Sequence, residues 1–463
     1  MIALRVVYYA PPIWFGISSS LTRYTRAIAF SFALLFISVL INASYAAERD
    51  TTFLYSNDVD QFVDDKPARP IFIEGGTLID GTGAAPRENP GILVKDGLLT
   101  LGPVSSRPVD AVEIDASEKW ILPGLFDLHA HLTFYLPGAF HVEDDLLSGI
   151  RAERFLEHYQ EIGVTTVCDV ASRNNVGFSM KRAQRMGLMG GSRLFVTGPG
   201  ITVTGGHPTE FQPYEDSHYG VEGDGPWELR KLVRTAVKKG ADFIKVFPPL
   251  TVAEYKAVVD EAHAWKLRVT AHAGGIQDLS TTSGSRAVDA GVDSIHHLHP
   301  YGENRDQIFL KMARDGIHVI PTIGYHLREV KGSEHIRGNW MEDNIGHNYG
   351  SVMSTFRAMQ EAGVSFGVGT ESNPFNMLTI ADIYAEELEG FIHAGFSAMQ
   401  VIRSATLHSA EVLGLREKAG SIETGKWADL LIINENPLED LRALVTPQLV
   451  IQAGNVVHQE RSH

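Results

Sequence analysis

The most informative segment of the sequence is LPGLFDLHAHL, residues 122–132. It is an apolar run of strand length that ends in two histidines, His129 and His131. Residues two apart on a strand project from the same side, about 7 Å apart along the backbone, and this spacing suits two ligands of one metal ion. Paired histidines also occur as polar surface residues, but the apolar strand before this pair argues against that alternative.

Downstream of Pro123, apolar runs of strand length alternate with helical stretches, which is typical of βα units around a parallel sheet. Thr251 with Glu254 forms a capping box that marks one helix start, and Ser397 with Gln400 marks another. Eight strands are predicted, the number that closes a (β/α)8 barrel. They lie near residues 122–128, 164–170, 193–197, 243–247, 268–272, 292–297, 318–322 and 365–369.

Short β runs broken by glycine flank this region on both sides. They occupy residues 70–120 and return in GSIETGKWADLLI and VIQAGNVV, within residues 409–463. Such runs are typical of small antiparallel strands. The predicted fold class is therefore α/β, with a (β/α)8 TIM barrel over residues 121–408 and a small β-sandwich built from the N- and C-terminal segments.

The first 46 residues differ from the rest of the chain. They carry three arginines and no acid, then the apolar run 27–41, and they end in Ser44-Tyr45-Ala46. This layout predicts a signal peptide that is cleaved after Ala46, a linker over residues 47–69 and an exported protein, periplasmic or secreted. The apolar run is short for a stable membrane span. An uncleaved membrane anchor and a misassigned start codon are the alternatives.

Composition narrows the class of protein. Hydrophobic residues at 44% and charged residues at 21% are typical of a folded protein with a sizeable core. Without the three N-terminal arginines, the chain has 37 basic and 56 acidic residues, a formal charge of −19. This negative charge makes nucleic acid an unsuitable partner.

Cys168 is the only cysteine, and its apolar neighbours predict a core residue rather than a disulfide or a nucleophile.

Lys245, in the apolar segment DFIKVF, is the second unusual feature. An ammonium inside an apolar strand costs several kcal/mol unless it is paired or loses its charge. A lowered pKa would make the amine nucleophilic enough to take up carbon dioxide, and the resulting carbamate is an anion that can bridge two metal ions. The alternative is a lysine at the strand end that extends its amine to solvent.

Further candidate ligands follow the later predicted strands. His272 ends RVTAH, and the next strand ends in SIHHLH, which offers His296, His297 and His299. Regular alternation places His297 and His299 on one face and His296 on the other, so at most two of the three point inward. Glu371 follows the eighth strand in GVGTES. Because the carboxyl ends of barrel strands meet at one mouth, these side chains are expected to converge there.

The motifs LPGLFDLHAHL, FIKV, VTAHA, GVDSIHH and GSIETGKWADLLI resemble those of the amidohydrolase superfamily, in its prolidase-like and imidazolonepropionase-like branch. The resemblance extends from about Pro70 to Val457. It implies two divalent metal ions. The implied metal ligands are His129 and His131 for the first ion, Lys245 as a carboxylated bridge, His272 and His297 for the second ion, and Glu371.

Two departures from the family pattern stand out. The usual SIEHG reads SIHHL here, so His296 replaces a glutamate. Glu371 replaces the usual aspartate, which acts as metal ligand and proton shuttle in the family. The extra methylene extends the carboxylate by about 1.5 Å, enough to weaken the catalytic geometry or to require a shifted backbone.

Three more residues are candidates for contact with substrate. His207, in GITVTGGHPTE, resembles the histidine of the family's TGGH loop, which faces the substrate carbonyl or its developing oxyanion. A solvated loop histidine beside two turn glycines is the alternative. Tyr325 and His326, just past the seventh predicted strand, are weaker candidates.

The resemblance predicts hydrolysis of a carbon–nitrogen bond in a small substrate, either a dipeptide or a cyclic amide. Zinc is the first choice of metal, with manganese and cobalt as alternatives. A hydrolase of lactones or phosphotriesters is one alternative function, because the same activated water attacks those centres. A metal-containing binding protein, catalytically weak because of Glu371, is another. The expected partner is the substrate, with no stable membrane span after cleavage; a homo-oligomer is compatible with the sequence.

Overall fold

The computed structural model describes residues 69–103, 105, 107–134, 145–209, 219–273, 282–298, 301, 304–324, 349–374 and 379–460. The predicted signal peptide, nearly all of the predicted linker, His299, Tyr325 and His326 lie outside the described residues.

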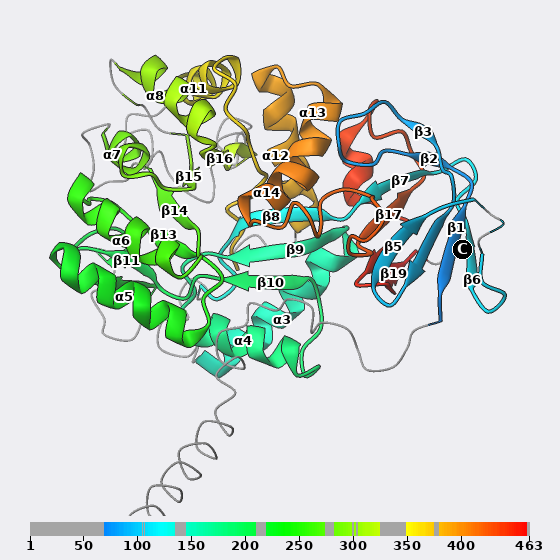
Figure 1. The fold of residues 1–463 in the computed structure, drawn as a ribbon, viewed down its shortest axis with the longest axis horizontal. Coiled ribbons are helices and arrows are strands. Elements are labelled where there is room, and N and C mark those ends of the chain that lie inside the picture. Colours follow the sequence, from blue (N-terminus) through cyan, green and yellow to red (C-terminus); the bar gives the residue numbers. More distant parts are fainter. Residues whose placement is uncertain are drawn as a thin grey trace, which may run out of the picture. The chain divides into compact units, whose positions relative to one another are not determined.

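Two parallel sheets form the larger part of the α/β fold (Figure 1). One has the strand order β10-β9-β8 and the other the order β12-β11-β13-β14-β15-β16. The strands are β8 (Leu125–Ala130), β9 (Val164–Asp169), β10 (Arg193–Val196), β11 (Gly200–Thr202), β12 (Gly220–Glu222), β13 (Ile244–Val246), β14 (Val269–His272), β15 (Ser294–His296) and β16 (His318–Ile320). Seven of them match predicted strands, whereas β11 and β12 were not predicted.

Backbone contacts run from one parallel sheet to the other on both sides. Residues 365–372 lie between β16 and β8, because Val319 bridges Phe366 and Ala130 bridges Ser372, both in parallel. The predicted eighth strand is thus present as isolated bridges. At the other side, the Asp242 N–H donates to the carbonyl of Val196 at 2.9 Å, which links the end of β10 to the start of β13.

Helices follow most of these strands and cover their outer side (Figure 1). Both predicted capping boxes are confirmed, at Thr251 with Glu254 and at Ser397 with Gln400. No described helix is both long and apolar enough to cross a bilayer. The helices are α3 (Asp145–Glu161), α4 (Val176–Arg185), α5 (Gly225–Lys239), α6 (Val252–Ala264), α7 (Ser283–Ala290), α8 (Arg305–Asp315), α11 (Tyr349–Glu361), α12 (Ile380–Ala394), α13 (Ala398–Arg403), the π-helical η5 (Ser404–His408) and α14 (Ser409–Val412).

Two further sheets, called the small sheets below, are formed outside the parallel ones; the first contains N-terminal strands alone, and the second combines strands from both ends of the described chain. Their orders are β5-β4-β1-β6 and β19-β18-β17-β7-β2-β3. The strands are β1 (Ile71–Glu74), β2 (Thr77–Leu78), β3 (Arg87–Glu88), β4 (Ile92–Lys95), β5 (Leu98–Leu101), β6 (Val112–Asp115), β7 (Trp120–Pro123), β17 (Leu430–Ile433), β18 (Leu449–Gln452) and β19 (Asn455–Gln459), with the 3-10 helix η6 (Leu441–Val445) before β18.

Two expectations about these strands were wrong. The pairs β1–β6 and β2–β7 are parallel rather than antiparallel, because other strands or long connections intervene between the partners. The predicted strand 122–128 is in fact split between β7, which pairs with β17, and β8. Gly124 lies at the break, where a Cβ atom would clash with the side chain of Thr165.

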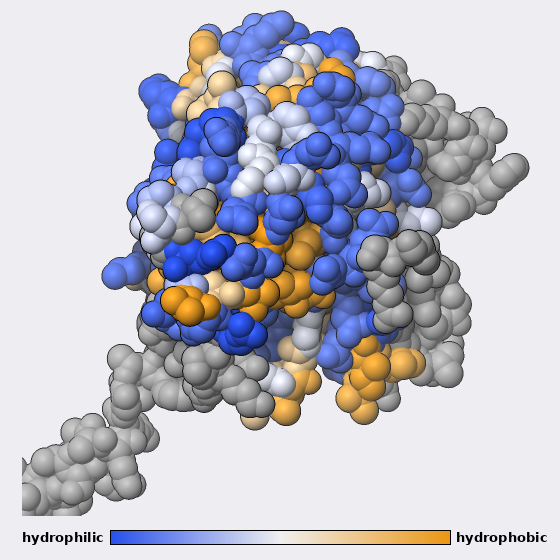
Figure 2. Space-filling model, turned by 90° about the vertical axis from the view of Figure 1, so that its right-hand side faces the viewer, coloured by the Kyte–Doolittle hydropathy of each residue, from blue (hydrophilic) through white to orange (hydrophobic). Residues whose placement is uncertain are grey.

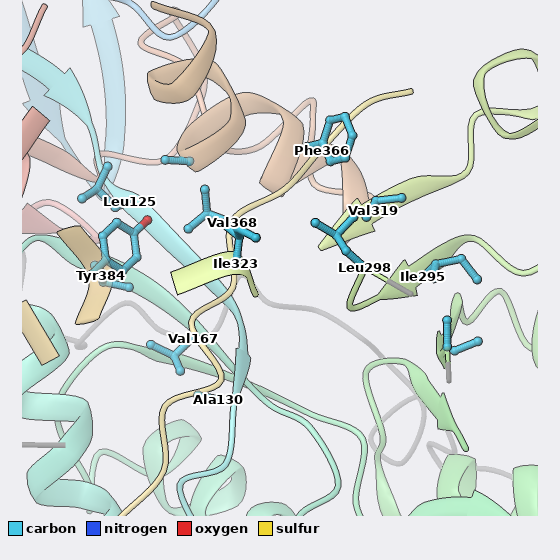
Figure 3. Close-up of a cluster of buried hydrophobic side chains, with 14 of the residues drawn as sticks. Leu125, Ala130, Val167, Ile295, Leu298, Val319, Ile323, Phe366, Val368 and Tyr384 are labelled. Carbon is cyan, nitrogen blue, oxygen red and sulfur yellow. The ribbon is translucent and has the colours of Figure 1, made fainter. Parts of the chain in front are cut away.

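The parallel sheets with their helices and the small sheets each have a buried apolar interior. Figure 3 shows part of the large cluster between strands and helices, where Leu125 and Val167 lie near Tyr384 of α12. A separate cluster joins the two small sheets through residues such as Ile73, Ile121 and Ile432. Cys168 is buried and free, as predicted. On the face shown in Figure 2, hydrophilic residues predominate and apolar surface is confined to limited areas.

Candidate metal centre

Two histidines and one glutamate lie close together at the end of β8. Nε2 of His129 is 3.2 Å from Nε2 of His131, and the two carboxylate oxygens of Glu371 lie 2.9 and 3.2 Å from these nitrogens. One ligand atom from each residue can be chosen so that all lie within 4.8 Å of one another. Two imidazoles and a carboxylate are a donor set that suits zinc and similar divalent ions.

His131 is oriented by the strand next to it. Its Nδ1 lies 2.7 Å from the carbonyl oxygen of Val170, so the Nδ1–H donates to the backbone and the lone pair of Nε2 faces Glu371. A carbonyl on the outer nitrogen is a common way to fix the tautomer of a metal-binding histidine. The ring also stacks on Phe134, with centroids 4.1 Å apart, and Phe134 in turn contacts Tyr219.

His129 contacts a second imidazole instead of a carbonyl. Its Nδ1 lies 2.6 Å from Nδ1 of His296. Burial lowers the pKa of His129 to about 3 and that of His296 well below its ordinary value, so both rings are neutral. The expected opposition of His296 and His297 was wrong. Strand β15 ends at His296, and His297 has a φ of 73°, so strand alternation stops there and both rings lie against His129, with centroids 4.5 and 4.8 Å away.

Glu371 reaches the histidines from an unusual backbone conformation. Its φ is 57°, in the left-handed region, and its N–H donates to the carbonyl of His129 at 2.8 Å. Burial raises the pKa of the carboxyl, but the close contacts with His129 and His131 outweigh that effect, so the pKa lies well below its ordinary value. The longer side chain is therefore accommodated by backbone conformation, and the carboxylate is ionised.

A buried carboxylate holds these segments together. Asp127 accepts hydrogen bonds from the backbone N–H groups of His129 and Thr370, from the Thr370 hydroxyl and from Tyr159 Oη. Tyr159 also contacts the hydroxyl of Ser372. Burial raises the pKa of Asp127 to about 6, although these hydrogen bonds oppose the shift. The network ties β8 to residues 370–372 and thereby positions Glu371 between them.

The remaining histidines continue the cluster away from β8. Ring centroids are 4.3 Å apart for His272 and His297, and 4.8 Å apart for His207 and His272. Nδ1 of His297 lies 2.7 Å from the hydroxyl of Thr322, and its Nε2 lies 3.9 Å from Glu371. The structure therefore brings together the five histidines that the sequence singled out as ligands or substrate contacts within the described residues.

Lys245 lies inside the fold, since the side chain is 1% exposed. This excludes the alternative in which the amine extends to solvent. Its Nζ has no hydrogen-bond partner among the described residues and lies 5.0 Å from the centroid of Phe247, whose ring is 5.3 Å from that of His272. Burial lowers the pKa of the amine to about 7. The unpaired nitrogen is compatible with a carbamate that would carry its own acceptors.

Two acids hold the loop that carries His207. The N–H and hydroxyl of Thr204 donate to Asp224, at 3.0 and 2.7 Å, and Glu222 accepts from the Gly205 N–H at 2.9 Å. Sequence reasoning overlooked these acids, along with Asp127, Phe134 and Tyr219. No local motif signals them, because their roles depend on which loops are neighbours in the fold.

Comparison with known proteins identifies the family. Residues 120–457 match the model of the amidohydrolase family. An ochratoxinase from Aspergillus niger is 24% identical over 430 residues, covering 83% of this chain and 85% of the relative. An imidazolonepropionase from Symbiobacterium thermophilum is 23% identical over 401 residues, 80% of this chain and 87% of the relative. The crystal structure of a Xaa-Pro dipeptidase with bound methionine is similar at a TM-score of 0.71 and 28% identity, covering 84% of this chain and 99% of that one. The chain therefore belongs to the amidohydrolase family and is a hydrolase.

Proposed function

We propose that this protein hydrolyses a carbon–nitrogen bond in a small amide substrate at a centre of two divalent metal ions. The observation that carries the proposal is the convergence of His129, His131 and Glu371 within metal-ligand distances of one another. The family generally uses metal ions, and the other histidines of the cluster supply enough donors for a second ion. Zinc is the metal that best suits this set of nitrogen and oxygen donors.

The residues divide between two metal positions. His129 and His131 would hold one ion, and His272 and His297 the other, with Glu371 as a further ligand. Lys245 would bridge them as a carbamate. Its uncharged amine adds to the carbon of carbon dioxide, forms a nitrogen–carbon bond and releases one proton to solvent. Because burial lowers the pKa of the amine to about 7, a substantial fraction is in the reactive form at neutral pH.

Bound metal ions would supply Lewis acidity, which lowers the pKa of water and polarises a carbonyl. Glu371 is suited to accept a proton from the attacking water and to deliver it to the leaving nitrogen, since its carboxylate is ionised and 22% exposed. His207 is suited to donate a hydrogen bond to the carbonyl oxygen as negative charge develops there. Phe134 and Tyr219 form an apolar wall beside His131 that excludes water from one side.

A dipeptide is the proposed substrate, and a cyclic amide is second. The likeness to a structure named a Xaa-Pro dipeptidase supports the first, and the relative named imidazolonepropionase supports the second. Tyr325 and His326 remain proposed substrate contacts.

The fold and the location in the cell complete the proposal. The two parallel sheets and residues 365–372 would form one closed (β/α)8 barrel over residues 121–408, and the small sheets a β-sandwich. The parallel bridges of residues 366 and 372 and the hydrogen bond from Asp242 to Val196 support the barrel, because they link the two sheets. The N-terminal 46 residues would direct export and be removed. N-terminal sequencing of protein from the native host tests this, and an intact Met1 in membranes would favour an anchor instead.

The decisive experiment combines metal analysis of the purified mature protein with a panel of dipeptides, cyclic amides, lactones and phosphotriesters. Two equivalents of metal and turnover of an amide are expected. Turnover of a lactone or phosphotriester alone would replace the substrate class. Metal without turnover would favour a binding protein, and absence of metal would contradict the proposal. A crystal structure with an unmodified Lys245 beside two metal ions would contradict the carbamate.

A further inference from the structure

The contact between His129 and His296 determines where their protons lie. Nε2 of His129 faces His131 and Glu371, so it must offer a lone pair if His129 binds metal. The single proton of this neutral ring is then on Nδ1, 2.6 Å from Nδ1 of His296. Two facing nitrogens share only one proton, so Nδ1 of His296 must accept it. The proton of His296 is consequently on Nε2.

A small cavity is lined in part by His296. It has room for about one water molecule, and its polar lining residues are Arg268, Thr270, Ser294 and His296. Among the described residues, the side-chain hydrogen bond of His296 is the one at Nδ1, to His129. The hydroxyl of Thr270, 2% exposed, has no partner in the described part of the chain. A buried hydroxyl without a partner is costly unless another group joins it.

We propose that His296 is a positioning residue for His129, and that a water in this cavity joins His296 Nε2–H to the Thr270 hydroxyl. This chain of hydrogen bonds from His129 through His296 and the water to Thr270, called the relay below, holds the proton of His129 on Nδ1. The Nε2 lone pair of His129 is then free to bind a metal ion. The inference rests on the proposed function, because it assigns His296 a role toward the metal. The imidazole of His296 accepts the Nδ1 proton of His129, as the carbonyl of Val170 accepts that of His131.

The test measures zinc affinity by competition with a chromogenic chelator. His296→Leu fills the space but cannot accept a hydrogen bond, and it is expected to lower zinc affinity about 10- to 100-fold, the range for loss of an outer partner of a metal ligand. His296→Asn places its Oδ1 where Nδ1 stood and should recover most of the affinity. Thr270→Val, at the far end of the relay, should lower it by about threefold.

His318→Leu is the matched control. His318 is also a buried histidine, on neighbouring β16, and the hydrogen bonds and ring contacts of His129 in the described part of the chain do not include it. Its substitution should leave zinc affinity within about twofold, a difference under 0.5 kcal/mol. Thermal unfolding of each variant reports on folding; if His296→Leu does not fold, His296→Asn and Thr270→Val carry the test.

Nitrogen NMR of histidine-labelled, zinc-loaded protein gives a readout that a purely structural role would not produce. The proton of His296 is expected on Nε2, and a proton on its Nδ1 would overturn the inference. Wild-type zinc affinity in His296→Leu would overturn it while leaving the proposed function intact. Unchanged affinity in Thr270→Val would remove the water from the relay. Failure of the wild type to bind zinc would overturn both proposals.

Discussion

Between the two small sheets, Ile73, Ile121 and Ile432 are at most 1% exposed and belong to one apolar cluster. Around the candidate metal centre, His129, Lys245 and His296 are just as deeply buried. Burial of the first group is favourable, at about 25 cal/mol per Å² of apolar surface. Burial of the second is unfavourable unless partners compensate, and the lowered pKa values of these groups reflect that cost. The apolar interior stabilises the fold, and the polar interior uses part of that stability to hold reactive groups.

The largest effect is expected from removing a ligand in the polar region. His129→Ala should abolish binding of one metal ion and lower kcat/KM on the order of 10³-fold or more, because the imidazole has no substitute at the end of β8. Metal analysis and steady-state kinetics measure both. His299→Ala is the comparison variant and should keep most metal and activity. Loss of metal in His299→Ala but not in His297→Ala would mean that the ligand of this strand end is His299.

Glu371→Gln is expected to have the next largest effect. It keeps the shape of the side chain but cannot accept a proton, so kcat should fall by roughly 10² while unfolding is unchanged. Glu371→Asp tests the length of the acid. Because the backbone at Glu371 is left-handed and already brings the longer carboxylate to 2.9 Å from His129, the aspartate variant should be less active than the wild type. Higher activity in Glu371→Asp would show that glutamate supports catalysis less well than aspartate at this position.

The apolar region should respond in the opposite manner. Ile432→Val removes one buried methylene between the small sheets and should lower the free energy of unfolding by about 1 kcal/mol. Its kcat/KM should match the wild type, since Ile432 belongs to a different buried cluster from the candidate metal centre. Urea unfolding and kinetics are the two measurements. A clear loss of activity would show that the small sheets influence the catalytic geometry.

The smallest effect is expected at the loop of His207. Asp224→Asn weakens one of the hydrogen bonds from Thr204 and should lower kcat/KM about threefold without changing the metal content. Glu228→Gln, in the first turn of α5, is the control: Glu228 accepts from the N–H of Asp224 and not from Thr204, and the glutamine keeps an acceptor oxygen there, so no effect is expected. Equal activities of Asp224→Asn and the wild type would mean that other contacts suffice to hold the loop.

Much of the arrangement could be predicted because it depends on short-range patterns. The alternation of apolar strands and capped helices predicted seven of the parallel strands within a few residues of their observed ends. The position of His129, His131, His272 and Glu371 at strand ends followed from the same pattern. The division of residues 122–128 did not, because Gly124 is required by the approach of Thr165, a contact between different strands.

The sequence by itself determined the types of residue that could bind metal, the order of the helices and strands, and the end of the parallel strands at which these residues meet. Local periodicity and chain direction dictate all three. Contacts between segments distant in the chain determined the rest. The left-handed conformations of His297 and Glu371 bring His297 to the same side as His296, against His129, and bring the longer acid within reach of His129 and His131. Strand alternation cannot foresee such conformations, because they persist only where hydrogen bonds from other elements hold them, as Thr322 does for His297 and the carbonyl of His129 does for Glu371.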